Sequence, residues 1–470
     1  MREPGEILIV SCYELGHQPL AAASALGFFE RAGYRPVAVD LAVEGLETLE
    51  QPDSWRRVRL VGISVPMHTA MHIGVRAARR LRLVAPRAHI CFYGHYAILN
   101  AEHLLETGVA DSATGGESEE SLVELAATLE DDSALEDVAG LWLAGRPARP
   151  LLKRLSFPVP SRGSLPELGR YAKLEANGET RLAAAVETSR GCLHLCRHCP
   201  IPPVYAGRFF VVPRSVVLED IRQLVRDGAT HITFSDPDFF NGPGHSLAIV
   251  RAMHEEFPEL TFDITTKVEH ILKHRARLDE IAACGCVFVV SAVESLSNTV
   301  LRHLMKGHTR EDVFTALSNL RSAGIPMRPS LVAFTPWTGL EDYRETLMWI
   351  DRDELIRNID PVQFSIRLLI PPGSPLAELD AMQPHLVELS QERFAHVWKH
   401  PDPRMDRLHG EISAIVHDAA LHEEDSERTF ERIWDAAFAV DRTLASPQIT
   451  RFPPARATVA PPRLTEPWFC

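Results

Sequence analysis

Long apolar runs, positive charge and cysteine are all scarce in this sequence. No stretch approaches the roughly 18 apolar residues that a membrane-spanning helix needs. The longest candidate, IAACGCVFVVSAV at 281–293, has the length of a strand or a core segment. The N-terminus, MREPGEILIV, lacks the charged start, apolar segment and cleavage site of a signal peptide. These absences disfavour a membrane-spanning or secreted protein and predict a cytoplasmic location.

The shortage of positive charge bears on the partners of the protein. Asp and Glu number 63 against 49 Lys and Arg, which gives a net charge of −14, and such a chain repels a phosphate backbone. The basic runs are short, such as ARRLR at 78–82, and are typical of a solvated helix face. We therefore expect a small-molecule substrate, with no nucleic acid and no membrane as partner.

The length of the chain and its strand–helix alternation predict two α/β domains. A chain of 470 residues exceeds one compact core. Within residues 1–150, helix-like stretches alternate with four strand-like segments, EILIVSCYE (6–14), GYRPVAVDL (33–41), RLVGISVPM (59–67) and HICFYGHYA (89–97). This alternation predicts a doubly wound, Rossmann-like parallel sheet with helices on both faces. Ligands bind such sheets at the carboxyl ends of the strands, where this sequence has Ser64, Gly94, Gly116 and Glu117.

A second strand–helix series follows a Pro-rich connector at 151–181. Six strand–helix units within residues 182–380 predict an open or partial (β/α)6 barrel of parallel strands. Residues 381–446 are strongly charged with a helical pattern, and residues 447–470 are Pro-rich, which is typical of an extended tail. The predicted fold class is therefore α/β, with two α/β domains, a helical C-terminal region and a tail that ends at Cys470.

Three of the 8 cysteines lie together in ETSRGCLHLCRHCPIP, at Cys192, Cys196 and Cys199. Disulfide frameworks belong to small secreted domains, and structural zinc usually takes four ligands in two pairs, of which no second pair is visible. A 4Fe–4S cluster bound by three thiolates leaves one iron open to a small chelating molecule. The run follows a strand and lies in a loop, so its side chains can converge on one cluster. The alternatives are a structural zinc and three unrelated buried cysteines.

The Cys-x3-Cys-x2-Cys spacing on the first strand–loop of a parallel barrel resembles the radical S-adenosylmethionine (SAM) superfamily. The resemblance implies a 4Fe–4S cluster on Cys192, Cys196 and Cys199. Its open iron would chelate the amino and carboxylate groups of SAM, and one electron would cleave a carbon–sulfur bond. The resemblance also implies an electron donor such as flavodoxin or ferredoxin.

Further residues match the superfamily by position. His198 lies where members carry an aromatic residue near the adenine of SAM, and SDPDFFN replaces the Gly-Gly-Glu run that binds its ammonium group. Asp236 or Asp238 would supply that carboxylate, and the alternative for either is a loop or helix-cap aspartate. The segment 289–313 resembles the glutamate-bearing strand of the superfamily and its following helix, so Glu294 is predicted to contact SAM.

The segment VQFSIRL (362–368) alternates polar and apolar residues. In a strand of period two, Gln363, Ser365 and Arg367 share one face, and a barrel strand turns one face to the lumen. An arginine that lines a lumen requires an anion. Arg367 is therefore predicted to hold a carboxylate of the cofactor or substrate, and the alternative is an ion pair with an aspartate or glutamate of the barrel.

The N-terminal domain, with GISVPM and GGESEESL at its strand ends, resembles the cobalamin-binding domain found before such barrels. The resemblance implies cobalamin as a further cofactor, bound by the four strand-end residues named above. The Asp-x-His-x-x-Gly signature of methionine synthase-type domains is absent, since His68 and His72 lie in PMHTAMHIG without it. The alternative is a domain that keeps the shape and has lost the corrinoid.

Cys470 ends the chain after a Pro-rich arm, and such an arm can fold back over a barrel mouth. Some similar proteins end in cysteine- or selenocysteine-containing tails. Among them are enzymes that transfer the aminocarboxypropyl group of SAM to arsenic, a soft atom that a thiolate suits. We therefore expect Cys470 near the chemistry and the natural reading frame to continue past it, and the alternative is a terminus that does not pack. Cys12, Cys91, Cys284 and Cys286 form no second triad and are expected to be small buried residues.

Four functions remain open on this basis. The leading one is a radical SAM enzyme that carries out cobalamin-dependent methyl transfer to an unactivated carbon of a small molecule. The second cleaves the other carbon–sulfur bond without a corrinoid and transfers the aminocarboxypropyl group, with Cys470 in the site. The third is a non-catalytic cobalamin or iron–sulfur sensor. The last is a tRNA-modifying enzyme, which the acidic balance disfavours.

Overall fold

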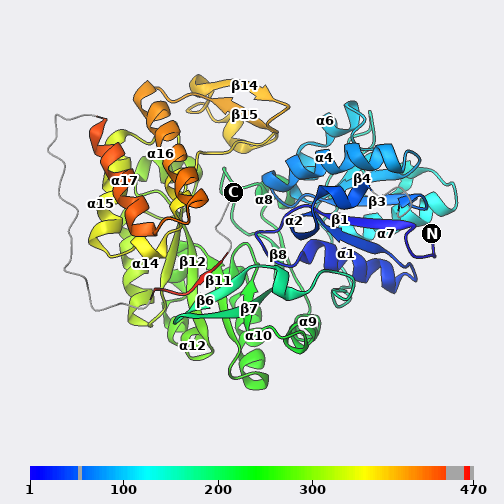
Figure 1. The fold of residues 1–470 in the computed structure, drawn as a ribbon, viewed down its shortest axis with the longest axis horizontal. Coiled ribbons are helices and arrows are strands. Elements are labelled where there is room, and N and C mark those ends of the chain that lie inside the picture. The colour runs from blue at the N-terminus through cyan, green and yellow to red at the C-terminus, as the bar shows by residue number, and fades with distance from the viewer. Residues whose placement is uncertain (51–54, 441–459, 466–470) are drawn as a thin grey trace.

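The computed structural model describes residues 1–50, 55–440 and 460–465, and Figure 1 shows two α/β units joined side by side. The N-terminal unit is blue and cyan and the barrel is green and yellow, while an orange hairpin reaches from the barrel side toward the N-terminal unit. The predicted fold class, a parallel N-terminal sheet before a partial barrel, is confirmed. None of the described helices is both long and apolar enough to cross a membrane.

The N-terminal sheet has five strands in the order β2-β1-β3-β4-β5, and all its pairs are parallel. The strands are β1 (Ile7–Ser11), β2 (Val37–Asp40), β3 (Leu60–Ser64), β4 (His89–Tyr93) and β5 (Ser112–Thr114). Every residue of β1 and β3 is buried, as expected for strands covered on both faces. This order places the topological switch point between β1 and β3, which is the usual ligand site of doubly wound sheets.

Helices cover both faces of this sheet (Figure 1). They are α1 (Leu20–Arg31), α2 (Leu41–Glu44), α4 (His68–Val84), α5 (His95–Leu99), α6 (Ala101–Glu106) and α7 (Ser118–Glu130). Leu26 of α1 and Leu122 of α7 share one buried cluster with Ile9, whereas Met71 of α4 and Leu104 of α6 share another. Helices α1 and α7 therefore cover one face, and α4 and α6 cover the other.

The barrel sheet has the strand order β13-β12-β11-β10-β7-β6-β16. Five strands are parallel, β7 (Glu179–Val186), β10 (His231–Phe234), β11 (Thr261–Thr266), β12 (Cys286–Glu294) and β13 (Met327–Leu331). Its covering helices are α9 (Arg214–Arg226), α10 (Pro243–Glu256), α11 (Val268–Lys273), α12 (Leu278–Ala283), α13 (Asn298–Leu304), α14 (Arg310–Ser322) and α15 (Leu340–Arg352). Cys12, Cys91, Cys284 and Cys286 are buried, as expected.

The predicted sixth strand, VQFSIRL, does not form, and this prediction is wrong. Pro361–Phe364 is a 3-10 helix, and a single bridge between Phe334 and Arg367 stands where a ladder was expected. Pro361 has no N–H for a ladder and its fixed φ favours a helical first turn. The Gln363 side chain accepts the Leu331 backbone N–H at 2.8 Å, so it satisfies a donor at the end of β13 that a neighbouring strand would otherwise satisfy.

The C-terminal region is not helical from its start. It begins with an antiparallel hairpin of β14 (Leu386–Ser390) and β15 (Ala395–Trp398), and only then come α16 (Pro403–Leu421) and α17 (Ser426–Ala439). Phe394 at the hairpin tip is buried in the core of the N-terminal domain, between the rings of His72 and His103. Burial of one such ring contributes about 1.5–3 kcal/mol, so the hairpin fastens the C-terminal region to the N-terminal domain.

Two strands lie outside the predicted barrel. Strand β6 (Lys173–Ala176), within the expected connector, pairs antiparallel with β7, and β16 (Arg463–Leu464) pairs antiparallel with β6. Strand β16 therefore runs in the same direction as β7, toward the carboxyl end of the barrel strands. Cys470 lies outside the described residues.

Short strands and helices complete the chain. They are β8 (Ser189–Gly191), β9 (Phe209–Val211), α8 (Ile201–Tyr205) and the 3-10 helices η1 (Leu46–Glu50), η2 (Leu135–Asp137), η3 (Leu168–Arg170), η4 (Phe239–Asn241), η5 (Arg275–Arg277), η6 (Ile356–Asn358), η7 (Pro361–Phe364), η8 (Pro375–Glu378) and η9 (Gln383–His385). Strands β8 and β9 and helix α8 enclose the cysteine-rich loop, which follows the first barrel strand as predicted.

Candidate active site

The cysteine-rich loop begins at a position that requires glycine. Gly191 has a φ of +74°, and a Cβ there would meet the Arg208 carbonyl oxygen at 2.5 Å. After this turn Cys192 and Cys196 are buried and Cys199 is half-buried. The His194 backbone N–H lies 3.5 Å from Cys192 Sγ and donates to it. The chain therefore folds the three thiols into one loop at the carboxyl end of β7.

The spacing of the thiols bears on what they can bind. Among the described residues, the group of three His, Cys, Asp or Glu ligand atoms that lie within 4.8 Å of one another is His194, Asp238 and His270, and the three thiols do not form such a group. A zinc ion binds each sulfur at about 2.3 Å and so holds its sulfurs within about 4.6 Å of one another. A cluster binds each thiolate through a different iron and spaces the sulfurs further apart. The donor set fits a cluster better than one zinc ion.

Glu294 at the end of β12 lies beside this loop. Its φ of +62° is a left-handed conformation that non-glycine residues seldom adopt, and the register between β12 and β13 shifts between Ala292 and Glu294. Its carboxylate accepts from Lys306 Nζ at 3.0 Å and lies 3.4 Å from His198 Nε2. The strained backbone turns this carboxylate toward His198, the residue that precedes the third cysteine. The predicted contacts of Glu294 and His198 with SAM stay predictions.

Electrostatics keeps Glu294 ionised. Burial opposes its ionisation, but Lys306 and His198 outweigh that effect and hold the pKa of this carboxyl well below its usual range. Burial by itself lowers the pKa of Lys306. Glu294 and the thiols of Cys196 and Cys199 together raise this pKa by more, so the net shift is upward. The result is a buried ion pair whose cation also interacts electrostatically with two of the three cysteines.

Sequence reasoning missed Lys306. The residue follows Met305, which has a φ of +58°, and its backbone N–H donates to Leu301 O at 3.0 Å. This helix end returns the chain toward the barrel and buries the lysine, which is 2% exposed. The sequence does contain one indication of this position, because Lys306 precedes Gly307 just after a predicted helix.

Asp236 and Asp238, the two candidates after β10, have different partners. Asp236 accepts from the Thr188 N–H at 2.9 Å, from the Thr188 hydroxyl at 2.7 Å and from the Ser189 hydroxyl at 2.6 Å. Burial raises its pKa to about 6, against the effect of these hydrogen bonds. Asp236 thus supports the turn that leads into the cysteine-rich loop, which is the loop role that the sequence left open.

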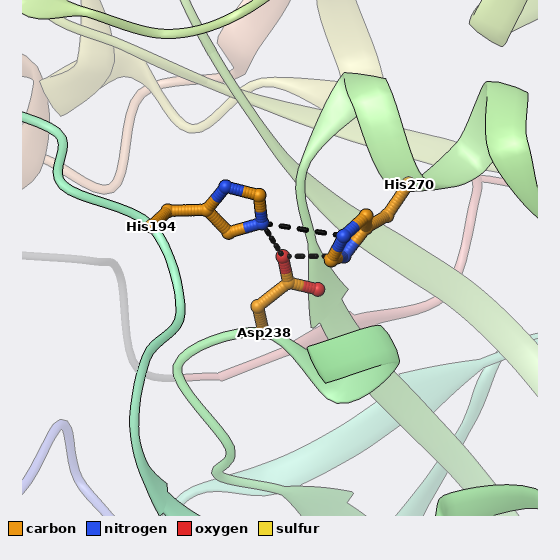
Figure 2. Close-up of side chains that lie close together, drawn as sticks. All are labelled: His194, Asp238 and His270. Carbon is orange, nitrogen blue, oxygen red and sulfur yellow. Dashed lines mark hydrogen bonds and ion pairs between the residues drawn. The ribbon is translucent and has the colours of Figure 1, made fainter. Parts of the chain in front are cut away.

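Asp238 faces the cysteine-rich loop directly (Figure 2). Its Oδ2 lies 2.8 Å from His270 Nδ1 and 3.6 Å from His194 Nε2. Asn241, three residues later, accepts the Leu193 backbone N–H at 3.3 Å and lies 3.7 Å from Cys192 Sγ. The segment SDPDFFN therefore contacts the first part of the loop, at Cys192 to His194, while Glu294 contacts its later part at His198.

Arg367 has partners outside the barrel lumen. Its Nη1 lies 2.8 Å from Asp406 of α16, its Nη2 donates to Trp398 O at 2.9 Å, and its guanidinium lies 3.6 Å from the Trp398 ring centre. The absent sixth strand explains this position, because without period-two geometry no lumen face is imposed on the residue. The ion pair corresponds to the alternative interpretation, with a helical partner in place of a barrel residue.

Of the four predicted cobalamin-binding residues at the strand ends of the N-terminal domain, two lie at the edge of the sheet and two are held by other parts of the chain. Ser64 ends β3 and Gly94 follows β4, so both lie at the carboxyl edge of the sheet. Gly116, with a φ of +74°, lies so close to the Leu151 carbonyl oxygen that a Cβ would clash with it, and it forms a bridge with that residue. Gly116 therefore contacts the connector, and this contact explains the glycine without a ligand.

Glu117 belongs to an ion cluster between the two domains. Tyr205 donates to its Oε1 at 2.9 Å, and Arg190 Nη1 lies 3.5 Å from its Oε2. The same guanidinium contacts Glu119 at 2.7 Å and Glu187 at 2.6 Å. Three carboxylates thus surround one arginine, and burial raises the pKa of Glu117 to about 7 despite that cation.

Residues 186–352 match the family model of the radical SAM superfamily. The barrel is a radical SAM domain. Over 374 residues the chain is 23% identical to an uncharacterized methyltransferase of Pyrococcus horikoshii, which covers 77% of this chain and 78% of that protein. A Drosophila melanogaster threonylcarbamoyladenosine tRNA methylthiotransferase is 22% identical and covers 54% of this chain and 47% of that protein.

Two solved structures have the fold of this chain. OxsB, a cobalamin-dependent SAM radical enzyme, superposes with a TM-score of 0.71 at 15% identity, covering 92% of this chain and 72% of that one. TsrM of Kitasatospora setae, a radical SAM methyltransferase, gives a TM-score of 0.60 at 17% identity, covering 73% and 71%. The arrangement of a doubly wound domain before a radical SAM barrel is therefore shared with these enzymes.

Proposed function

We propose that this chain is a radical SAM transferase whose cluster is held by Cys192, Cys196 and Cys199. The observation that supports it most is the cysteine-rich loop at the barrel mouth with the buried Glu294–Lys306 pair beside it. The radical SAM superfamily uses a 4Fe–4S cluster and SAM, and the three cysteines lie within residues 186–352, which match the model of that superfamily.

The residues around the loop divide the binding of SAM between them. Lys306 Nζ offers N–H donors to an anionic group beside Cys196 and Cys199, and the carboxylate of SAM is such a group. Glu294 offers an acceptor to ammonium or hydroxyl groups, and its pair with Lys306 fixes its direction. His198, 3.4 Å from Glu294, would offer its imidazole to the adenine. The cluster supplies the electron that cleaves a carbon–sulfur bond of SAM.

Cobalamin-dependent methyl transfer to a small molecule is the reaction that we propose first. The N-terminal sheet has the order of a doubly wound ligand-binding domain. At its carboxyl edge Thr114 Oγ1 is buried without a hydrogen-bond partner among the described residues, which fits a site for a polar ligand. Ser64 and Gly94 would hold the corrinoid from this edge, whereas Gly116 and Glu117 are occupied by Leu151 and Arg190. OxsB is a cobalamin-dependent radical SAM enzyme and TsrM is a radical SAM methyltransferase, and the fold that this chain shares with them supports the proposal.

Aminocarboxypropyl transfer is the second candidate. It is favoured by the direction of β16, which pairs with β6 and runs toward the carboxyl end of the barrel strands. In the sequence Cys470 follows Thr465 by five residues. In this reaction Cys470 would hold the soft acceptor atom.

Product analysis distinguishes the two reactions. Anaerobically reconstituted protein with SAM and a reductant, such as dithionite or reduced flavodoxin, should form 5′-deoxyadenosine or S-adenosylhomocysteine in methyl transfer and methylthioadenosine in aminocarboxypropyl transfer. Corrinoid bands in the visible spectrum would support the first reaction. Effector binding without any turnover of SAM would contradict both and favour a sensor. A cytoplasmic location, suited to an oxygen-sensitive cluster, remains a prediction.

A further inference from the structure

A chain of polar side-chain contacts runs from Lys267 to Asp238 through the middle of the cysteine-rich loop. Lys267 Nζ lies 3.0 Å from His194 Nδ1, and His194 Nε2 lies 3.2 Å from His270 Nε2. His270 Nδ1 then lies 2.8 Å from Asp238 Oδ2. Figure 2 shows the two rings and the carboxylate turned toward one another. His194 is between the first two cysteines, so this chain ties the loop to the barrel.

The first member of the chain fixes the direction of every bond. An ammonium group has N–H donors and no acceptor, so His194 Nδ1 must accept from Lys267. The proton of the neutral His194 ring is then on Nε2, which donates to His270 Nε2. The His270 proton is in turn on Nδ1, which faces the Asp238 carboxylate. A single tautomer of each ring satisfies all three contacts.

The direction of the hydrogen bond from Lys267 to His194 argues against a metal ion between His194, Asp238 and His270. His194, Asp238 and His270 resemble the two-histidine, one-carboxylate donor set of divalent iron. A ring that binds a metal through Nε2 needs that nitrogen unprotonated and usually donates its Nδ1–H to an acceptor. Lys267 cannot accept that hydrogen bond, and its charge repels a cation. The cluster of side chains is therefore better explained as a chain of hydrogen bonds that ends in the His270–Asp238 ion pair.

Asp238 anchors the far end of the chain. Its side chain is buried, and its Oδ1 accepts from the Thr266 hydroxyl at 2.7 Å and from the Phe240 N–H at 3.2 Å. A buried carboxylate is retained only where such bonds compensate its lost hydration. These bonds fix Asp238 to the end of β11 and to the turn after β10. Asp238 in turn holds the His270 ring, which contacts His194.

We propose that Lys267, His270 and Asp238 are positioning residues that hold His194 and thereby set the reduction potential of the cluster. This inference rests on the proposed function of the cysteines. The His194 backbone N–H donates to Cys192 Sγ, and hydrogen bonds to cluster sulfurs together with nearby positive charge raise a cluster's potential. The chain keeps this N–H in place. Lys267, which also pairs with Glu269 Oε2 at 3.2 Å, supplies the N–H donor that holds the His194 ring.

Redox titration of reconstituted protein followed by electron paramagnetic resonance (EPR) tests the proposal. Lys267→Met should bind as much iron as the wild type, with a more negative midpoint potential, and Lys267→Arg should restore most of the difference. His270→Phe should shift the potential in the same direction and broaden the EPR signal, because the loop then samples several conformations. His274→Phe, on the neighbouring ring at 5.6 Å, is the matched control and should match the wild type.

A measurement without the cluster separates this inference from the proposed function. In cluster-free protein, amide hydrogen exchange of residues 192–199 should be about fivefold faster in His270→Phe than in His274→Phe, as expected for the loss of one hydrogen bond. Unchanged potentials and unchanged exchange in Lys267→Met and His270→Phe would overturn the positioning role. Stoichiometric binding of Co²⁺ by the cluster-free wild type, lost in His270→Phe, would also overturn it and assign a metal site instead. A wild type that holds no cluster would contradict the proposed function, and the exchange data would still decide the positioning role.

Discussion

Two ion clusters involve residues in or next to the cysteine-rich loop, and they differ in the balance of carboxylates and cations. Two residues before the first cysteine, Arg190 faces the three carboxylates of Glu117, Glu119 and Glu187. Next to the third cysteine, the single carboxylate of Glu294 faces Lys306 and His198. The first cluster has more carboxylates than cations, and the second has more nitrogen groups than carboxylates.

The difference indicates which side carries the chemistry. Thiolates and the carboxylate of SAM are anions, and in a site of low dielectric an adjacent cation stabilises them strongly. Lys306 lies on the side that supplies this cation. The carboxylates around Arg190 belong to both domains, since Glu117 and Glu119 come from the N-terminal domain and Glu187 follows β7. That cluster therefore joins the domains rather than binding the reactants.

Lys306→Met should have the largest effect. It removes the cation beside Cys196 and Cys199 and leaves the Glu294 carboxylate buried with His198 alone. Loss of one partner of a buried ion pair costs about 3–5 kcal/mol of stability, and SAM cleavage should fall at least ~100-fold because the anion site is lost. Chemical denaturation and product analysis measure the two effects.

The double variant Glu294→Gln/Lys306→Met is the control for that experiment. It removes both charges, so most of the lost stability should return while SAM cleavage stays low. Full cleavage activity in the double variant would contradict the assignment of this cluster to SAM.

Arg190→Met should destabilise the protein while sparing the chemistry. Three carboxylates lose their shared cation, and we expect the free energy of unfolding to fall by about 3 kcal/mol. The iron content per folded chain and the cleavage of SAM should stay within about twofold of the wild type, because Arg190 faces the domain interface. A loss of SAM binding at unchanged stability would reverse the comparison between the two clusters.

Glu117→Gln should stabilise the protein above neutral pH. Burial raises the pKa of Glu117 from 4.5 to about 7 in the folded state, with Glu119, Glu187, Arg190 and Tyr205 facing it. Folding therefore opposes its ionisation, and wild-type stability rises as the pH falls from about 7 toward 4.5. The glutamine should add about 1–2 kcal/mol at pH 8, and this gain should disappear near pH 5. Thermal unfolding across this pH range measures it, and a gain that grows on acidification would contradict the account.

Arg367→Met should have the smallest effect. The residue joins α16 and Trp398 through a half-exposed ion pair and a ring contact, and such contacts are worth about 1 kcal/mol. The rate of SAM cleavage should not change. A loss of cleavage at wild-type stability would restore the role that the sequence predicted for this arginine.

The elements that the sequence predicted well are those encoded by local pattern. Strands β1, β3 and β4 are uninterrupted apolar runs between turn residues, and such runs form buried strands in any parallel sheet. The cysteine motif is equally local, since three ligands within eight positions define the loop. Glu294 and His198 were proposed from their resemblance to positions in the superfamily, and the structure places them 3.4 Å apart.

The errors share a physical cause, which is that local pattern competes with tertiary contacts. VQFSIRL alternates like a strand, but Pro361 begins a 3-10 turn and Gln363 takes the place of a ladder partner. The hairpin of β14 and β15 was interpreted as helix because its charged residues obscure the alternation. Lys306 and His270 escaped notice because their roles depend on neighbours far away in sequence, and His270 lies 76 residues from His194.

The most direct test of the account is the iron and the EPR spectrum of anaerobically reconstituted protein. The account predicts one 4Fe–4S cluster per chain in the wild type, a reduced-state EPR signal that changes when SAM is added, and no cluster in the triple variant Cys192→Ala/Cys196→Ala/Cys199→Ala. Three results would contradict the claim that these cysteines hold a SAM-binding cluster: a wild type without a cluster, an EPR signal that does not change when SAM is added, or a triple variant that keeps its iron.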